Sequence, residues 1–169
     1  MVYKVGVTHV SHFLKEVDIF KGLSEQHLDR IAGLCEEYSF KAGDYLGIQG
    51  TQGDKIYIIR RGEITVNTGS GQTQLVVRTV RERETFPVAV LFEPPLLVTT
   101  TRAATDGEAF ALPRVRLMEL CELEPKIGMQ IFKAVCEILM SRYRYTLNRL
   151  AESVDADVHI GALRDGSEV

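Results

Sequence analysis

The sequence predicts a mainly β fold with flanking helices: N-terminal helices, a small antiparallel barrel and one long C-terminal helix. The prediction rests first on the spacing of apolar residues, which changes twice along the chain. The spacing is helical at the front, alternates from Glu37 to about Leu112, and is helical again from about Arg114. The second observation is that short apolar runs in the middle zone are separated by turn residues at spacings near ten residues, which is typical of a small barrel or sandwich.

The front zone predicts helices from about Thr8 to Glu37, with a break at Gly22. Ser24 is placed to cap the second helix, because its short polar side chain can accept a hydrogen bond from the first turn. Leu28 and Ile31 then follow on one helical face.

The middle zone predicts short strands between glycines at positions 43, 50, 53 and 62, which permit tight corners. The run Ile56–Ile59 is apolar at every position, so we expect an interior strand that is buried on both faces. These glycines therefore predict turns of the fold and do not indicate a catalytic or binding site.

The last zone predicts a long helix from about 125 to 153, which Pro125 begins because the first turn needs no N–H from it. A flexible tail is expected at 154–169, where the sequence turns polar. One apolar stripe follows the helix for several turns: Ile131, Phe132, Val135, Cys136, Leu139, Tyr143, Leu147 and Leu150.

Composition places limits on function. A chain of 169 residues with 45% apolar content can bury the core of one domain, expected at 8–153. The net charge of −3 argues against a protein that coats phosphate backbones. Three scattered cysteines without a CxxC pair, a poor signal peptide and no apolar run long enough for a membrane helix predict a cytoplasmic protein with no membrane partner.

The stretch Gly50–Gly62, "GTQGDKIYIIRRG", resembles the first signature of the cyclic nucleotide-binding domain family. The match includes both turn glycines, the four apolar residues and the final glycine, and it departs upstream where Gly47 stands in place of an aliphatic residue. With "FKAGDYL" and "TRAATDGEAFALP", the resemblance extends over roughly Phe13 to Leu150. It implies that the barrel is a β-roll or jelly roll, and that a cyclic nucleotide is the ligand to consider.

In this family a phosphate-binding cassette follows the sixth strand, and "FPVAVL" at Phe86–Leu91 falls at that place. The resemblance implies that a glutamate in the cassette holds the ribose 2′-hydroxyl and that an arginine pairs with the phosphate. Here Pro87, Val88 and Val90 replace the glycine, the glutamate and the small residue.

The phosphate arginine has two possible alignments. Either Arg102 of "RAA" is that arginine after a long cassette, or "TTTRAATDGEAFAL" matches the following strands and Leu97 replaces it. We favour the second, which keeps the strand spacing up to Leu112, and therefore expect no binding of cAMP or cGMP in the family's usual way. The candidate pocket residues are Phe86, Pro87, Val88, Ala89, Val90, Leu91, Leu97, Val98, Thr99 and Arg102.

The long helix has two interpretations. Phe132, Val135, Leu139 and Tyr143 have a coiled-coil-like spacing and predict a homodimer, as in dimeric bacterial sensors of the family. Alternatively, the same stripe packs back on the barrel. We expect a helix of this length to do both, with its N-terminal half on the barrel. No DNA-reading unit follows the stripe, so no direct nucleic-acid partner is expected.

An enzyme of this barrel shape would need metal-binding His residues on facing strands. His9, His12, His27 and His159 lie outside the predicted strands, so no metal site and no catalytic residue is expected. We therefore expect a regulatory or sensor module. The alternatives are a true cyclic-nucleotide-binding domain that uses Arg102 and a structural module that binds a protein partner.

Overall fold

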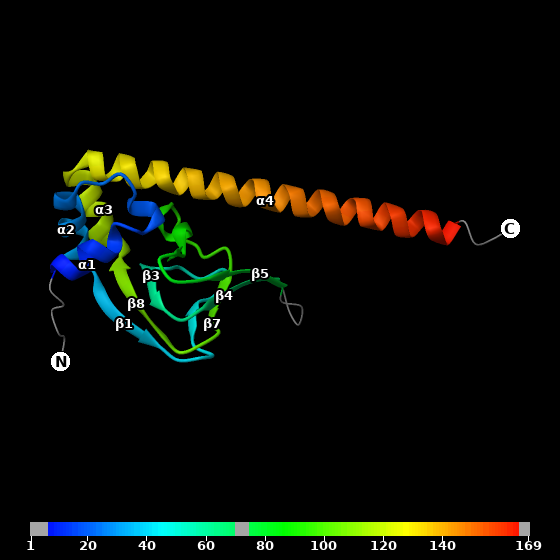
Figure 1. Ribbon diagram of the computed structural model, residues 1–169, viewed down its shortest axis with the longest axis horizontal. Helices are drawn as coiled ribbons and strands as arrows, with labels where there is room; N and C mark the ends of the chain where they lie inside the picture. The colour runs from blue at the N-terminus through cyan, green and yellow to red at the C-terminus, as the bar shows by residue number, and fades with distance from the viewer. Residues whose placement is uncertain (1–6, 70–74, 166–169) are drawn as a thin grey trace. The chain divides into compact units, whose positions relative to one another are not determined.

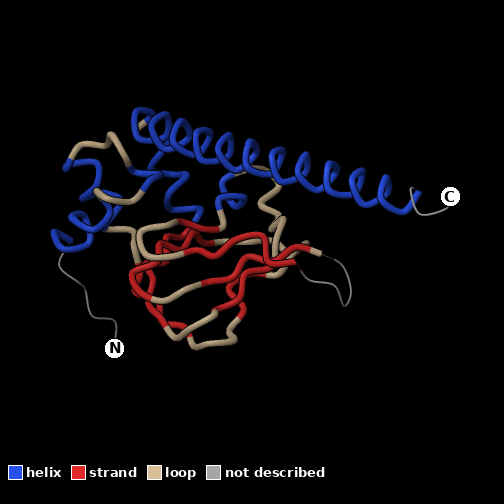
Figure 2. Tube along the Cα trace, turned by 45° about the vertical axis from the view of Figure 1, so that its right-hand side comes forward, coloured by secondary structure: helices blue, strands red, loops and turns tan. Residues whose placement is uncertain are grey.

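The computed structural model describes residues 7–69 and 75–165. Its centre is a sandwich of two four-stranded antiparallel sheets, with strand orders β1-β8-β3-β6 and β2-β7-β4-β5. The strands close into a compact roll with helices at one end (Figure 2), so the predicted fold class is confirmed. The strands are β1 (Glu36–Phe40), β2 (Tyr45–Gly47), β3 (Lys55–Arg61), β4 (Ile64–Thr68), β5 (Leu75–Val80), β6 (Thr85–Phe86), β7 (Thr100–Ala103) and β8 (Gly107–Pro113).

Strand β3 shows how the sandwich is stabilised. Ile56, Ile58 and Ile59 are fully buried, as predicted for an interior strand that is covered on both faces. Ile59 joins the cluster between the two sheets, which includes Phe86 on β6. Ile58 pairs with Phe110 on β8, and the Phe110 ring contacts the ring of Phe13 in the N-terminal helical region. Each face of β3 therefore contributes to the hydrophobic core.

The N-terminal helices are α1 (Val7–Leu14), the 3-10 helix η1 (Asp18–Phe20) and α2 (Glu25–Ala32). Figure 1 shows α1 and α2 gathered with α3 (Arg114–Leu123) at one end of the sandwich. The Ser24 cap is confirmed, since its hydroxyl accepts the His27 N–H at 3.3 Å. The predicted helical zone up to Glu37 is wrong at its end, because Glu36 and Glu37 pair with β8 and begin the first sheet.

The last helix, α4 (Pro125–Asp165), begins at the predicted proline. Residues 1–134 and 135–169 form two compact units, and α4 runs from the first into the second. The helical backbone continues to Asp165, beyond the predicted helix end at 153. No proline follows Pro125 to stop the helix. Residues 166–169 of the expected tail lie outside the described residues.

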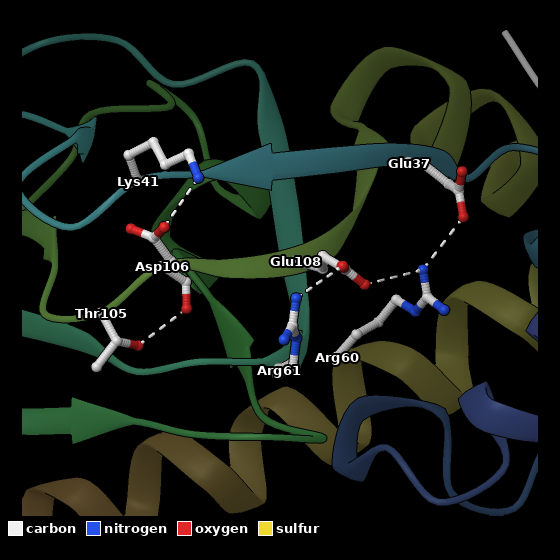
Figure 3. A network of polar contacts seen from close by, with 7 residues as sticks. All are labelled: Glu37, Lys41, Arg60, Arg61, Thr105, Asp106 and Glu108. Atoms are coloured by element: carbon white, nitrogen blue, oxygen red, sulfur yellow. Dashed lines mark hydrogen bonds and ion pairs between the residues drawn. The ribbon is translucent and has the colours of Figure 1, made fainter.

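A network of charged side chains crosses the first sheet (Figure 3). Arg60 on β3 bonds to Glu37 on β1 at 3.1 Å, and its guanidinium carbon lies 4.8 Å from the centre of the Phe110 ring. Lys41 and Asp106, in two neighbouring turns, form a 2.8 Å ion pair. These contacts join strands that are distant in sequence.

In the part of the chain that the structure describes, no helix has the length and apolar character needed to cross a bilayer.

Candidate functional site

The cassette segment follows β6 and forms the 3-10 helix η2 (Val88–Leu91) before a loop leads to β7. Five of its apolar side chains are at most 6% exposed: Phe86, Val88, Val90, Leu91 and Leu97. Pro87, Ala89 and Thr99 are half-buried, whereas Val98 is 67% exposed. Burial therefore explains the apolar character of η2 and of Leu97, whereas Phe92, Leu96 and Val98 in the same connection are exposed.

The loop after η2 is bonded to the glycine-rich turn between β2 and β3. Gly50 N–H donates to the Leu97 carbonyl at 2.8 Å, and Leu97 N–H donates to the Thr51 carbonyl at 2.9 Å. Gly53 N–H donates to the Pro95 carbonyl at 2.9 Å. Turn formation alone does not explain Gly53, because a Cβ there would lie 2.5 Å from Val90 Cγ1 and 2.9 Å from Leu97 Cδ2. The absence of a side chain at Gly53 allows the cassette to lie close to this turn.

Leu97 also explains the departure at Gly47. A Cβ on Gly47 would lie 2.8 Å from Leu97 Cδ1, closer than real Cβ atoms approach a neighbour. The leucine side chain thus occupies space between Gly47 on β2 and Gly53 in the turn. Gly47 and Leu97 are therefore sterically complementary.

Arg102 lies on the exposed face of β7. Side chains alternate along a strand, and here Thr101 and Ala103 are buried while Arg102 points outward. Its Nε donates to the Gly43 carbonyl at 3.1 Å, and its guanidinium carbon lies 5.4 Å from the centre of the Tyr45 ring.

A cavity of about 240 Å³ lies beside the cassette, between β2, the turn and β3. Its lining includes Leu97, Tyr57 and the exposed carboxylate of Asp54. Among the described residues that line it, the only cation is Lys55, and Lys55 Nζ is paired with Glu36 at 3.2 Å. The lining thus holds one carboxylate and one cation that is already paired, which is unfavourable for an anionic ligand.

Tyr57 supplies an aromatic wall to this cavity. Its ring stacks on Phe86 with centroids 5.5 Å apart and lies 5.0 Å from the Tyr38 ring. Burial, with Tyr38 and Asp54 nearby, raises the pKa of Tyr57 to about 12. The phenol is therefore neutral at physiological pH and presents a hydrogen-bond donor.

Sequence reasoning missed Arg114, the first residue of α3. Its Nε donates to the Val90 carbonyl at 2.6 Å, and its guanidinium also pairs with Glu93. The arginine therefore contacts the cassette from outside the cavity lining. A signal was present, because a cation in the first turn of a helix is disfavoured by the helix dipole and calls for an explanation.

The four residues expected at a dimer interface differ in exposure. Val135 is fully buried, and Phe132 is half-buried with its ring 6.3 Å from that of Phe92. Leu139 and Tyr143 are 37% and 59% exposed.

A family model for the cyclic nucleotide-binding domain matches residues 37–124, more than half of the chain. The chain belongs to this family. Its domain is a regulatory module, and is not a catalytic one. The match begins in β1 and ends after α3, so it includes the turn, the cassette and Arg114.

Relatives and solved structures of this family are similar to the chain over different spans. A cGMP-dependent protein kinase of Drosophila melanogaster, isozyme 2 forms cD5/T2, is 42% identical over 64 residues, which are 38% of this chain and 7% of that protein. Isozyme 1 from the same organism is 31% identical over 68% of this chain and 16% of its own length. The crystal structure of a cyclic nucleotide-binding domain from Methylobacillus flagellatus superposes with a TM-score of 0.74 at 16% identity, over 87% of this chain and 83% of that one. The chain thus spans a small part of these kinases and most of a solved single domain.

Proposed function

We propose that this chain is a regulatory module that does not bind cAMP or cGMP through the family's usual ribose and phosphate contacts. The observation that carries the proposal is the buried Leu97, which packs between Gly47 and Gly53. If Leu97 stands at the phosphate arginine's place, a phosphate there would meet a hydrocarbon side chain. Burying an anion without a partner is costly, whereas a bidentate arginine would compensate for much of that cost.

The cassette backbone supports the same proposal. Pro87 has no N–H to offer an anion, and Val90 N–H donates to the Pro87 carbonyl at 3.4 Å. Val88 takes the position of the ribose glutamate and is 6% exposed. The residues aligned with the family's ligand contacts therefore make contacts within the protein.

A second candidate is a true cyclic-nucleotide-binding domain that uses Arg102. The specific observation in its favour is the 42% identity to a segment of a kinase named for its dependence on cGMP. On this alternative, Arg102 must break its contacts with the Gly43 carbonyl and the Tyr45 ring before it can bind a phosphate.

Thermal unfolding with and without millimolar cAMP or cGMP separates the two candidates. A ligand at one hundred times its dissociation constant adds about 2.7 kcal/mol of stability, which is visible as a shift in Tm. We expect no shift. A shift that is lost in Arg102→Ala would establish the second candidate, and a shift that survives this substitution would show binding at another group.

The exposed apolar stripe of α4 supports a further part of the proposal, that the module pairs with a second copy of itself. Four residues on the segment after Ala134 are between 37% and 59% exposed: Leu139, Tyr143, Leu147 and Leu150. They recur at steps of four, four and three, close to the spacing with which two helices pack along a seam. A twin helix with the same stripe would remove this apolar area from water.

A further inference from the structure

We propose that Arg114 is a positioning residue that fixes the cassette and ties it to α3 without a bound ligand. The inference deepens the proposed function, since a module that needs no nucleotide must order its cassette by other means. The polar contacts of one side chain and its backbone carry the argument.

Three contacts join Arg114 to three segments. Its backbone N–H donates to the Asp54 carbonyl at 2.8 Å, which joins the start of α3 to the glycine-rich turn. Its Nε donates to the Val90 carbonyl inside η2 at 2.6 Å. The other arm of the guanidinium pairs with the Glu93 carboxylate in the loop that follows. The planar guanidinium of an arginine can make both side-chain contacts at once, whereas the ammonium of a lysine is a single point charge.

The position of Arg114 is unfavourable for α3 itself. The first turn of α3 contains no acidic residue, and Pro113 before it provides no side-chain cap. A cation at a helix N-terminus opposes the helix dipole. The Arg114 side chain is also only 16% exposed, so its charge needs partners. Its side-chain partners lie in the cassette and in the loop that follows, so this placement stabilises that segment and not α3.

The two side-chain contacts differ in strength. The Glu93 side chain is 74% exposed, so solvent and salt weaken that ion pair. Val90 is fully buried, and a buried carbonyl that loses its donor is costly to leave unpaired. We therefore expect the bond to Val90 to contribute more than the ion pair.

The test is to measure amide hydrogen exchange by NMR, on the whole chain and without nucleotide. The reporters are Val90 N–H and Phe92 N–H, which donate within the cassette at 3.4 and 3.2 Å. Arg114→Met should speed exchange at both by about tenfold, because a hydrogen bond to a charged group stabilises against local opening on this scale. Arg116→Met is the matched control: Arg116 is exposed in the same helical turn, and its loss should change both rates by less than about twofold.

Arg114→Lys keeps the charge but not the planar guanidinium, and it keeps the proposal testable if the methionine variant does not fold. It should give a smaller increase in exchange that is confined to the cassette and the first turn of α3. Wild-type rates in Arg114→Lys, or equal effects of Arg114→Met and Arg116→Met, would overturn the proposal. So would a uniform increase in either Arg114 variant that includes the β4–β7 pairs, because it would indicate only a loss of global stability. Cyclic nucleotides are absent throughout, so these results are independent of the thermal-shift outcome.

Discussion

Leu97 is the residue on which the proposed loss of phosphate contacts depends. Its side chain is 5% exposed, and Leu→Ala at such a site typically costs about 2–5 kcal/mol. We predict that Leu97→Ala lowers the free energy of unfolding within this range, measured by urea denaturation. Val98→Ala is the control, because Val98 is 67% exposed and should change stability by less than about 0.5 kcal/mol. Equal effects at the two positions would show that Leu97 does not fill the site.

We expect Gly53 to accept a methyl group only if the neighbouring cassette side chains move. Gly53→Ala places a Cβ within 2.5 Å of Val90 Cγ1, and overpacking of this kind costs about 1–3 kcal/mol. In a Val90→Ala background that Cγ is absent, so we predict that the same substitution costs less there. Urea unfolding of the two single variants and the double variant measures the coupling. Additive costs would contradict direct contact between the turn and the cassette.

Single residues were predictable where their role is local. Ser24 and Pro125 act on their own helical turns, so the adjacent sequence is enough to place them. The fit of Leu97 to Gly47 and Gly53 joins segments distant in sequence, and no local pattern encodes it. Arg114 was missed for the same reason, because its partners are Val90 and Glu93.

Between elements, Lys41 and Asp106 join the turn after β1 to the turn before β8. The hydrogen bond from the Lys41 ammonium and that from the Ala42 N–H hold the pKa of Asp106 below its usual value. A lowered folded-state pKa gives stability that is present above the unfolded-state value of about 3.9 and is lost as pH falls through the folded-state pKa. The partner bond raises the pKa of Lys41, so its contribution is present below about pH 10.4 and is lost as pH rises through the folded-state pKa.

We predict that Asp106→Asn lowers Tm at pH 7 and makes Tm less dependent on pH below about 4. Both side chains are exposed, so the difference at pH 7 should shrink in 1 M salt, in which the Debye length is about 3 Å. Thermal unfolding at the two pH values and two salt concentrations measures these effects. Asp29→Asn, which removes an exposed carboxylate on α2, is the control. If the two variants have the same pH profile, the ion pair does not stabilise the turns.

Element types were predictable to the extent that one periodicity dominated a segment. The strands of the roll followed from alternation and glycine turns, and Ile56–Ile59 forms the expected interior strand. The local pattern predicts a helix up to Glu37, because the pairing of Glu36 and Glu37 with β8 is a long-range contact that no local pattern encodes. The backbone of α4 extends beyond the predicted end at 153, because polar residues can continue a helix and a polar segment alone does not mark where it ends.

At the scale of the whole molecule, the proposed pairing through α4 would give this regulatory module a way to transmit a signal. We predict that the chain sediments as a dimer at tens of micromolar, and that Leu139→Glu with Tyr143→Glu converts it to a folded monomer. Both side chains are exposed, so the charges should cost little in the isolated chain but should be buried unpaired at a seam between two copies. Leu123→Glu on α3, at a residue that is 76% exposed, is the matched control and should leave the sedimentation unchanged. A wild-type monomer would contradict pairing through α4, whereas a dimer that survives the double substitution would place the interface elsewhere on the chain.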